Sequence, residues 1–172
     1  MTDAEIEDLL EDVRRRVRIV GTYPPVVFKD FCQTENFCSG YYSLYDGLVV
    51  ISEQSKRSQP ELAYTYLHEM CHQIHMKFGV DTLHHHGETF GILFATALIR
   101  DGTFSRFSLY NFCQTEKAGE WVCDDDLIER FRTILHFGRK FAATRLSLEH
   151  IAERLLPIPP PKKSWWERLF FS

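Results

Sequence analysis

His68-Glu69-Met70-Cys71-His72 and His86-Gly87-Glu88-Thr89-Phe90 are the two runs on which the predicted fold depends. Both lie within residues 58–90, a segment typical of a helix, a loop and the start of a second helix. The first run is an H-E-x-x-H motif. Its two histidines are four residues apart, so they share one helix face and can chelate a single metal ion. The sequence therefore predicts a metal centre on this helix.

The helix that carries the first run has clear predicted boundaries. Ser58-Gln59-Pro60-Glu61 is a capping box with proline in the first turn, and Gly79 follows the last apolar residue. His68, His72 and His75 lie opposite an apolar stripe, so we expect them to line a cleft or contact solvent. The stripe consists of Ala63, Tyr66, Leu67, Met70, Cys71, Ile74 and Phe78.

A catalytic zinc site needs a third protein ligand and keeps a fourth position for water. His75 lies about 10.5 Å along the helix from His68, too far to share its ion easily. His86 fits, because it would stand at the start of the next helix, where the positive dipole end favours the neutral imidazole that binds metal. Chemistry alone leaves other donors open in the same loop, namely His84, His85 and, as a second choice, Glu88.

Glu69 directly follows the first histidine and is the candidate general base. In such a site zinc polarises a carbonyl and acidifies its bound water, and the carboxylate moves the proton from that water to the leaving amine. A tetrahedral intermediate needs a further hydrogen-bond donor. Four tyrosines stay open for that role: Tyr41, Tyr42, Tyr45 and Tyr64.

Three more helices are predicted towards the two ends of the chain. A capping box and apolar residues at helical spacing predict a helix over residues 2–20, which Gly21 should end. Negative charge at its start favours a helix over 124–137, which Gly138 should break. A last helix is predicted near 147–156.

Strand signals lie between the first helix and the histidine motif. Val26-Val27-Phe28 begins one strand, and β-rich runs at 40–45 and 48–52 flank Asp46-Gly47, a strong hairpin signal. The helix expected from residue 88 to about 100, after a loop over 80–87, is apolar almost all round, so it should be buried. These elements predict an α+β fold.

Composition fits one globular domain. The chain has 172 residues, of which 44% are hydrophobic and 26% charged. The acidic N-terminus lacks the features of a signal peptide, and no apolar stretch approaches the length of a membrane span. Five cysteines without a secretion signal indicate a reducing cytosol, so we expect a cytoplasmic protein. A secreted bacterial effector with an unconventional signal would share this pattern.

The two histidine runs together resemble the SprT-like, or Spartan-like, zinc metalloproteases. That family shows H-E-M-x-H on the active-site helix and then H-G-x-x-F, and the similarity covers about residues 40–100. The resemblance implies zinc ligands at His68, His72 and His86 and a catalytic Glu69. It selects His86 over its neighbours because His86 directly precedes the glycine.

The resemblance also implies the fold and the activity. It implies a zincin-like α+β domain over residues 1–156, with a small antiparallel or mixed sheet packed on the H-E-x-x-H helix and additional C-terminal helices. The activity implied is that of a zinc-dependent endopeptidase acting on protein substrates. The alternative is a non-catalytic, zinc-stabilised binding or scaffold protein, against which the intact Glu69 argues.

DNA is the further partner that the resemblance implies, because family members cleave proteins crosslinked to DNA. Many members carry a zinc ribbon or a basic segment after the core, whereas this chain has no C-x-x-C pair and a formal net charge of −4. One modest basic cluster is present, which more often is a solvated helix face. It consists of Arg130, Arg132, Arg139, Lys140 and Arg145.

Residues 157–172 form a Pro-rich linker and an aromatic tail that contains Trp165-Trp166 and Phe170-Phe171. Such a tail suits docking to a partner or a membrane interface. It equally suits packing back onto its own domain. The corresponding alternative function is a target-docking protease of a mobile element or effector system.

Overall fold

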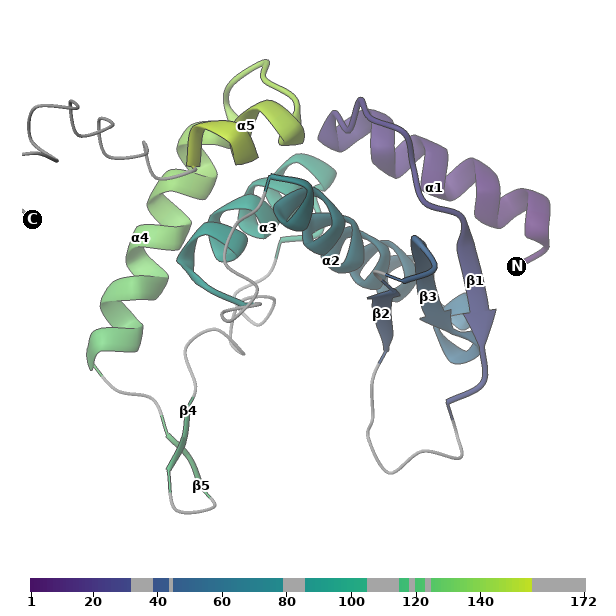
Figure 1. Cartoon of the computed structure of the whole chain (residues 1–172), viewed down its shortest axis with the longest axis horizontal. Coiled ribbons are helices and arrows are strands. Elements are labelled where there is room, and N and C mark those ends of the chain that lie inside the picture. Colours follow the sequence, from purple (N-terminus) through teal and green to yellow (C-terminus); the bar gives the residue numbers. More distant parts are fainter. Residues whose placement is uncertain are drawn as a thin grey trace, which may run out of the picture.

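Five α-helices and a three-stranded mixed sheet make up most of the part of the chain that the structure describes (Figure 1). This computed structural model describes residues 1–31, 39–43, 45–78, 86–104, 115–117, 120–122 and 125–155. The predicted α+β class is confirmed. The elements, in order, are α1 (Asp3–Val17), β1 (Val26–Lys29), β2 (Gly40–Ser43), β3 (Leu48–Ser52), the 3-10 helix η1 (Glu53–Arg57), α2 (Gln59–Lys77), α3 (Glu88–Asp101), β4 (Thr115–Lys117), β5 (Glu120–Val122), α4 (Asp125–Ala142) and α5 (Leu148–Leu155).

The sheet has the order β1-β3-β2. Its central strand β3 runs parallel to β1 and antiparallel to β2, with Val50 opposite both Val27 and Tyr41. The predicted hairpin is confirmed, since β2 and β3 are joined through a turn in which Gly47 has a φ of 61°. Glycine suits this position because a left-handed backbone strains other residues.

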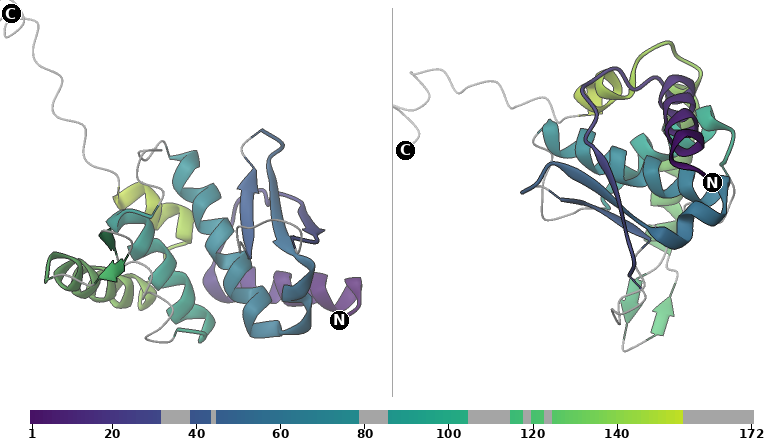
Figure 2. Two further views of the ribbon diagram at one scale, coloured as in Figure 1. Left: turned by 90° about the horizontal axis from the view of Figure 1, so that it is seen from below. Right: turned by 90° about the vertical axis from the view of Figure 1, so that its right-hand side faces the viewer.

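The layers follow the order sheet, α2, α3, α4, and α1 runs across α2 and α3 (Figures 1 and 2). A separate two-stranded sheet pairs β4 with β5. The predicted burial of α3 is confirmed, since all its residues from Phe90 to Leu98 are buried. Helices α2 and α3 therefore form the centre of the core, and the histidine motifs lie on them.

Helix α1 begins as predicted and ends early. Thr2 and Glu5 form the capping box, and the buried face consists of Ile6, Leu10, Val13 and Val17. The predicted extension to residue 20 is wrong, because Arg18 takes a left-handed conformation with a φ of 63°. The chain turns there so that Ile19 packs in the core. The N–H groups of Val20 and Gly21 then donate to the carboxylate of Glu149 in α5.

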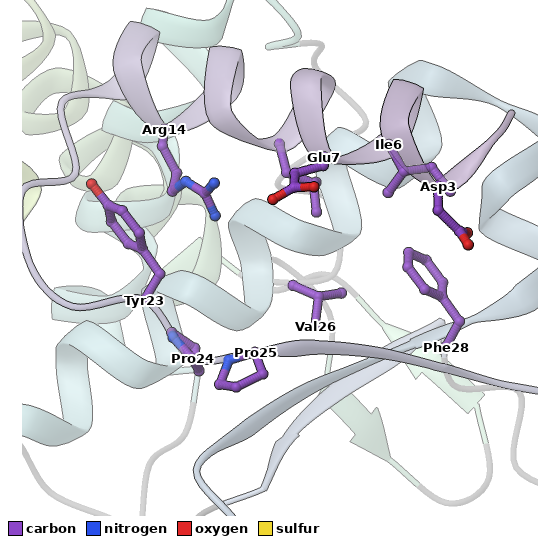
Figure 3. Close-up of a pocket in the computed structure, with 10 residues that line it drawn as sticks. Asp3, Ile6, Glu7, Arg14, Tyr23, Pro24, Pro25, Val26 and Phe28 are labelled. Atoms are coloured by element: carbon purple, nitrogen blue, oxygen red, sulfur yellow. The ribbon is translucent and has the colours of Figure 1, made fainter.

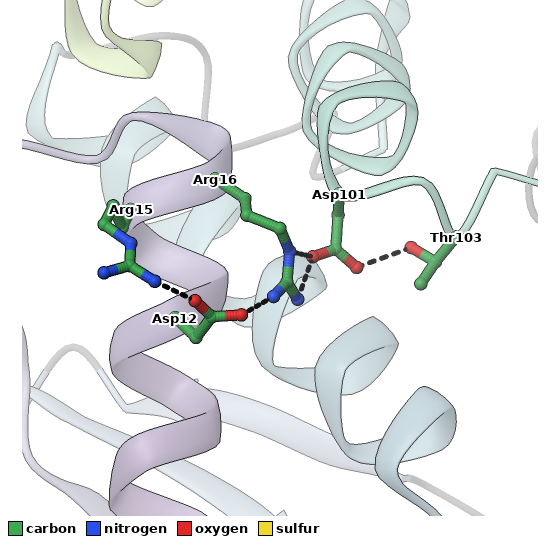
Figure 4. A network of polar contacts seen from close by, with 5 residues as sticks. All are labelled: Asp12, Arg15, Arg16, Asp101 and Thr103. Carbon is green, nitrogen blue, oxygen red and sulfur yellow. Dashed lines mark hydrogen bonds and ion pairs between the residues drawn. The ribbon is translucent and has the colours of Figure 1, made fainter.

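A polar network ties the end of α1 to the end of α3 (Figure 4). Asp101 accepts hydrogen bonds from Arg16 Nε at 2.9 Å and Nη2 at 2.6 Å, and from Thr103 Oγ1 at 2.9 Å. Its side chain is fully buried. On α1, Asp12 pairs with both Arg15 and Arg16. A buried carboxylate needs such partners, so this network fixes how the two helices meet.

The prediction that Gly138 breaks the fourth helix is wrong. Helix α4 continues to Ala142, and Gly138 lies inside it against α3. A Cβ atom added at Gly138 would stand 2.8 Å from the Cβ of Ala95. The glycine is therefore a point of close helix contact and not a stop. The last helix, α5, agrees with its predicted range.

Several expectations fall outside the described residues. They are the stop at Gly79, the donors His84 and His85, and the tail 157–172. Among the helices of the described ranges, none combines the length and the apolar character that a membrane span requires.

Candidate metal centre

His68 and His72 lie one turn apart on α2. The helix begins where predicted, because the Ser58 side chain accepts a hydrogen bond from the Glu61 N–H at 3.4 Å. The apolar side of α2 is buried, with Leu67, Met70 and Cys71 completely inaccessible. This buried side anchors the helix, and both histidines remain partly accessible.

His86 lies just before α3, whose N-cap is Gly87. The next turn carries Phe90, which is completely buried. Its ring stacks on His72 with a centroid distance of 4.3 Å and meets His68 and His86 edge-on at 5.2 Å each. The aromatic residue of the second run therefore forms a common wall for all three imidazoles.

The three imidazoles converge on one point. Each pair of Nε2 atoms among His68, His72 and His86 is separated by 3.1 Å. Three nitrogens at tetrahedral positions around zinc, each about 2.05 Å from it, lie about 3.3 Å apart. The three histidines thus lie close enough together to bind one metal ion. Imidazole also suits copper, iron and nickel, so the donors do not by themselves identify the metal.

Burial keeps His68 in the neutral form that can bind a metal ion. Desolvation, together with the neighbouring charge of His86, lowers the pKa of His68 from 6.5 to about 3. Neutral imidazole is the species that donates a lone pair to a metal. At neutral pH His68 is therefore ready to bind without first losing a proton.

Glu69 is buried, with 4% of its surface exposed. Burial raises the pKa of its carboxyl group from 4.5 to about 7, and a hydrogen bond from the Tyr42 backbone N–H partly offsets this. A Cβ atom added at Gly40 would approach Glu69 Cγ to 3.4 Å, so β2 lies directly against this side chain. Glu69 therefore changes protonation near neutral pH.

His75 does not belong to this group. The expectation that it lines a cleft or contacts solvent is wrong, because it is 3% exposed and its ring lies 6.0 Å from Phe90. Helix α3 packs over that part of α2 and covers it. Glu88, the second-choice donor, is exposed in the first turn of α3 and is not a member of the cluster found among the described residues.

The four tyrosines differ in their surroundings. Tyr64 lies one turn before His68 on α2, and its ring meets Phe94 edge-on at 5.3 Å. Burial raises the pKa of its hydroxyl group. Tyr45 is completely exposed at the hairpin turn, and Tyr41 is 38% exposed. Tyr64 is thus the candidate that shares a helix face with His68 and His72.

Arg130 is a site residue that sequence reasoning missed. Its Nη2 atom, on α4, donates a hydrogen bond of 2.9 Å to the backbone carbonyl oxygen of His86. The sequence indicated only a basic cluster on a predicted helix. The neighbouring Arg132 fits that description, because it is exposed and pairs with Glu129 at 3.4 Å.

A cavity of about 380 Å³ lies between α1 and the segment that leads into β1 (Figure 3). Its walls are largely apolar, and Arg14 stacks over the Tyr23 ring with a distance of 4.4 Å. None of the three histidines lines it. The cavity is therefore separate from the metal centre.

Comparison with known proteins identified no similar protein. No match to this chain was found among protein-family models, curated proteins or solved structures. A functional interpretation therefore depends on the geometry of the histidine cluster, Glu69 and the elements around them.

Proposed function

We propose that this protein is a zinc-dependent endopeptidase of the SprT-like type, with a zincin-like arrangement of sheet and H-E-x-x-H helix. The observation that carries the proposal is a buried carboxylate, Glu69, directly adjacent in α2 to a histidine of the three-imidazole cluster. A carboxyl group with a pKa near 7 suits general acid–base chemistry at neutral pH. A purely structural metal site does not require a buried carboxylate beside its ligands.

His68, His72 and His86 would hold the ion. Their mutual Nε2 distances of 3.1 Å fit a single small cation, and three protein ligands are the number typical of catalytic zinc. When bound, zinc acts as a Lewis acid toward a carbonyl oxygen and makes a water molecule more acidic. Phe90 packs against all three rings and restricts their rotation.

Glu69 would move the proton. Its carboxylate accepts a proton from the attacking water and returns it to the nitrogen of the leaving amine. The Tyr42 N–H holds the carboxylate in place, and burial makes that carboxylate basic enough to accept a proton near neutral pH. The base is therefore positioned by β2 and α2 together.

The decisive experiment compares Glu69→Gln with the wild type in cleavage of fluorescein-labelled casein and in bound zinc. We expect the variant to lose cleavage and to retain zinc, because the amide cannot accept the proton. Glu61→Gln, an exposed position in the first turn of the same helix, is the matched control and should cleave normally. Casein cleavage by Glu69→Gln equal to that of the wild type would overturn the mechanism.

The same experiment separates the peptidase from a zinc-stabilised scaffold. A scaffold would bind zinc, gain thermal stability from it and cleave nothing in the wild type. Glu69→Gln should raise stability at neutral pH in both cases, because it removes a buried ionisable group, so casein cleavage by the wild type decides between the two functions.

DNA is the activating partner in this proposal, and α4 is the surface that would contact it. Exposed cations on this helix border an open cavity of about 470 Å³, namely Arg132, Arg139 and Lys140. Casein cleavage should rise when double-stranded DNA is added and fall back at high salt, because phosphate contacts weaken as salt increases. A cleavage rate that changes with neither DNA nor salt would contradict DNA activation, although the protein would still be a peptidase.

A further inference from the structure

Helices α3 and α4 lie side by side in a fixed register. A Cβ atom at Gly91 would stand 2.5 Å from Ile134 Cδ1, and one at Gly138 would stand 2.8 Å from the Cβ of Ala95. Ala95 lies four residues after Gly91 on α3, and Gly138 lies four residues after Ile134 on α4. The two helices therefore run in the same direction, with one ridge of α4 against one ridge of α3.

The same register holds at both ends of the pair. At the far end, Arg100 of α3 donates hydrogen bonds to the carbonyl oxygens of Phe141 at 3.0 Å and Thr144 at 3.2 Å. At the near end, four residues before Ile134, Arg130 reaches the carbonyl oxygen of His86 at 2.9 Å. The contact between Arg130 and His86 thus lies at one end of a continuous interface between α3 and α4.

His86 needs an external support that the other two ligands do not. His68 and His72 lie inside α2, where the helix itself sets the backbone. His86 precedes the N-cap of α3, so its carbonyl group stands outside the hydrogen-bond ladder of that helix. A guanidinium that binds this carbonyl restrains the peptide from which the imidazole extends.

The Arg130 side chain is held against the protein beside His86. Its Nε atom is buried and has no hydrogen-bond partner among the described residues. The guanidinium therefore donates through Nη2 at the surface, while its Nε atom lies against the protein. Arg132, two residues later, is 72% exposed, so the two arginines of one helix have different surroundings.

We propose that Arg130 is a positioning residue of the metal centre, which holds the backbone of His86 so that its Nε2 atom stays with those of His68 and His72. Helix α4 thereby becomes part of the metal site, although none of its described side chains belongs to the histidine cluster. This inference rests on the metal centre of the proposed function and does not depend on peptidase activity.

The test measures metal binding by the full chain. Arg130→Met should lower zinc affinity about tenfold, measured by competition with a chelator, as loss of a supporting contact behind a ligand typically does. The absorption spectrum of the cobalt(II)-loaded variant should also change, because the third imidazole is less well oriented. Arg130→Lys can still donate to the same carbonyl and should recover part of the affinity.

Arg132→Met is the matched control, since it removes the same charge from the same helix. It should keep wild-type zinc affinity and the wild-type cobalt spectrum. The proposal is overturned if Arg130→Met and Arg132→Met bind zinc equally well. It is also overturned if Arg130→Met loses affinity while its cobalt spectrum stays unchanged and Arg130→Lys recovers nothing, because that pattern indicates a general loss of stability.

Two measurements keep the outcome clear. Thermal unfolding of the metal-free variants shows whether Arg130→Met still folds. If it does not, Arg130→Gln, which removes the charge but keeps a polar side chain, takes its place, and a zinc affinity equal to that of Arg132→Met then overturns the proposal. Failure to cleave casein in every variant, the wild type included, would contradict the proposed peptidase and leave the role of Arg130 in metal binding intact.

Discussion

The backbone N–H of Tyr42 in β2 donates a hydrogen bond to the side-chain carboxylate of Glu69 in α2. Strand β2 is an edge strand, and the Ser52 N–H bonds to the Ser39 carbonyl oxygen across the β2–β3 pair. Because bonded and non-bonded positions alternate along an antiparallel pair, the N–H of Tyr42 points away from β3. The free edge of the sheet therefore orients the proposed general base.

Gly40→Ala should disturb this arrangement. The added methyl group would stand 2.8 Å from Thr65 Cγ2 and 2.9 Å from the carbonyl oxygen of Val50, which forces β2 away from α2. We expect a loss of roughly 1–3 kcal/mol in the free energy of unfolding. Casein cleavage should also fall, because Glu69 loses its backbone donor. Urea unfolding and the casein assay measure the two effects.

Gly47→Ala is the control for Gly40→Ala. A Cβ atom at Gly47 meets no described residue within 4 Å, but its φ of 61° strains an alanine by about 1 kcal/mol. This variant should lose stability and keep its cleavage rate. Equal rates in the two variants would mean that the contact between β2 and Glu69 is irrelevant to turnover.

Glu69 should make the metal-free protein less stable as pH rises from about 4.5 to 7. Its pKa is raised from 4.5 to about 7 on folding, so in this window the folded state keeps a proton that the unfolded state has lost. The unfolding free energy then falls with pH by about 3 kcal/mol and levels off above pH 7. Glu69→Gln removes this dependence.

The measurement is the difference in unfolding free energy between Glu69→Gln and the wild type at several pH values. The difference should rise by about 3 kcal/mol in favour of the variant between pH 4.5 and 7, and should then stay constant. Subtraction removes titrations common to both proteins, including that of His68, whose lowered pKa acts in the opposite direction. A constant difference throughout would mean that Glu69 ionises normally.

Metal analysis of the purified protein should give one zinc ion per chain. His86→Ala removes one of three donors and should abolish stoichiometric binding, whereas His136→Ala, on an exposed turn of α4, should not. Mass spectrometry of the metal content measures both. Zinc retained in the His86→Ala variant would assign the third ligand to His84, His85 or Glu88.

Arg16 should matter more to stability than its neighbour Arg15. Removal of Arg16 leaves the fully buried Asp101 with Thr103 as its remaining donor in the network, so Arg16→Met should cost about 2–3 kcal/mol. Arg15 is 78% exposed and its ion pair within the described residues is with Asp12, so Arg15→Met should cost at most about 0.5 kcal/mol. Urea unfolding compares them. Equal losses would contradict the role of the buried ion pair.

Signals that act over a few residues were predictable from sequence. The Thr2–Glu5 capping box, the hairpin turn at Gly47 and the cap at Ser58 each depend on atoms within three or four residues. The spacing of His68 and His72 likewise depends only on helix geometry. His86 was selected by the resemblance, and the structure brings its Nε2 atom to the same point.

Features that depend on how elements pack could not be predicted in this way. His75 is buried because α3 covers that part of α2, and helical periodicity does not reveal which element lies above a polar side. Helix α1 ends at Val17 because residues 19–21 are held by the core and by α5. The bond between Arg130 and His86 joins residues 44 positions apart and depends on the register of α3 and α4.

Gly138 provides the sharpest test of that register. In an isolated helix, Gly138→Ala would add about 1 kcal/mol of stability, because alanine favours helix. Here the new methyl group would meet Ala95 at 2.8 Å and push α4 away from α3, so we expect a net loss of roughly 1–2 kcal/mol. Zinc affinity should fall as well, because Arg130 moves with α4.

The double variant Ala95→Gly with Gly138→Ala exchanges the two sides of this contact and restores the space between the helices. It should recover most of the zinc affinity lost in Gly138→Ala, even though a glycine in α3 costs about 1 kcal/mol of helix stability. Chelator competition and urea unfolding on the same samples separate affinity from stability. A more stable Gly138→Ala variant with unchanged zinc affinity would show that α4 can shift without consequence for His86, and would remove the structural basis for coupling this helix to the metal centre.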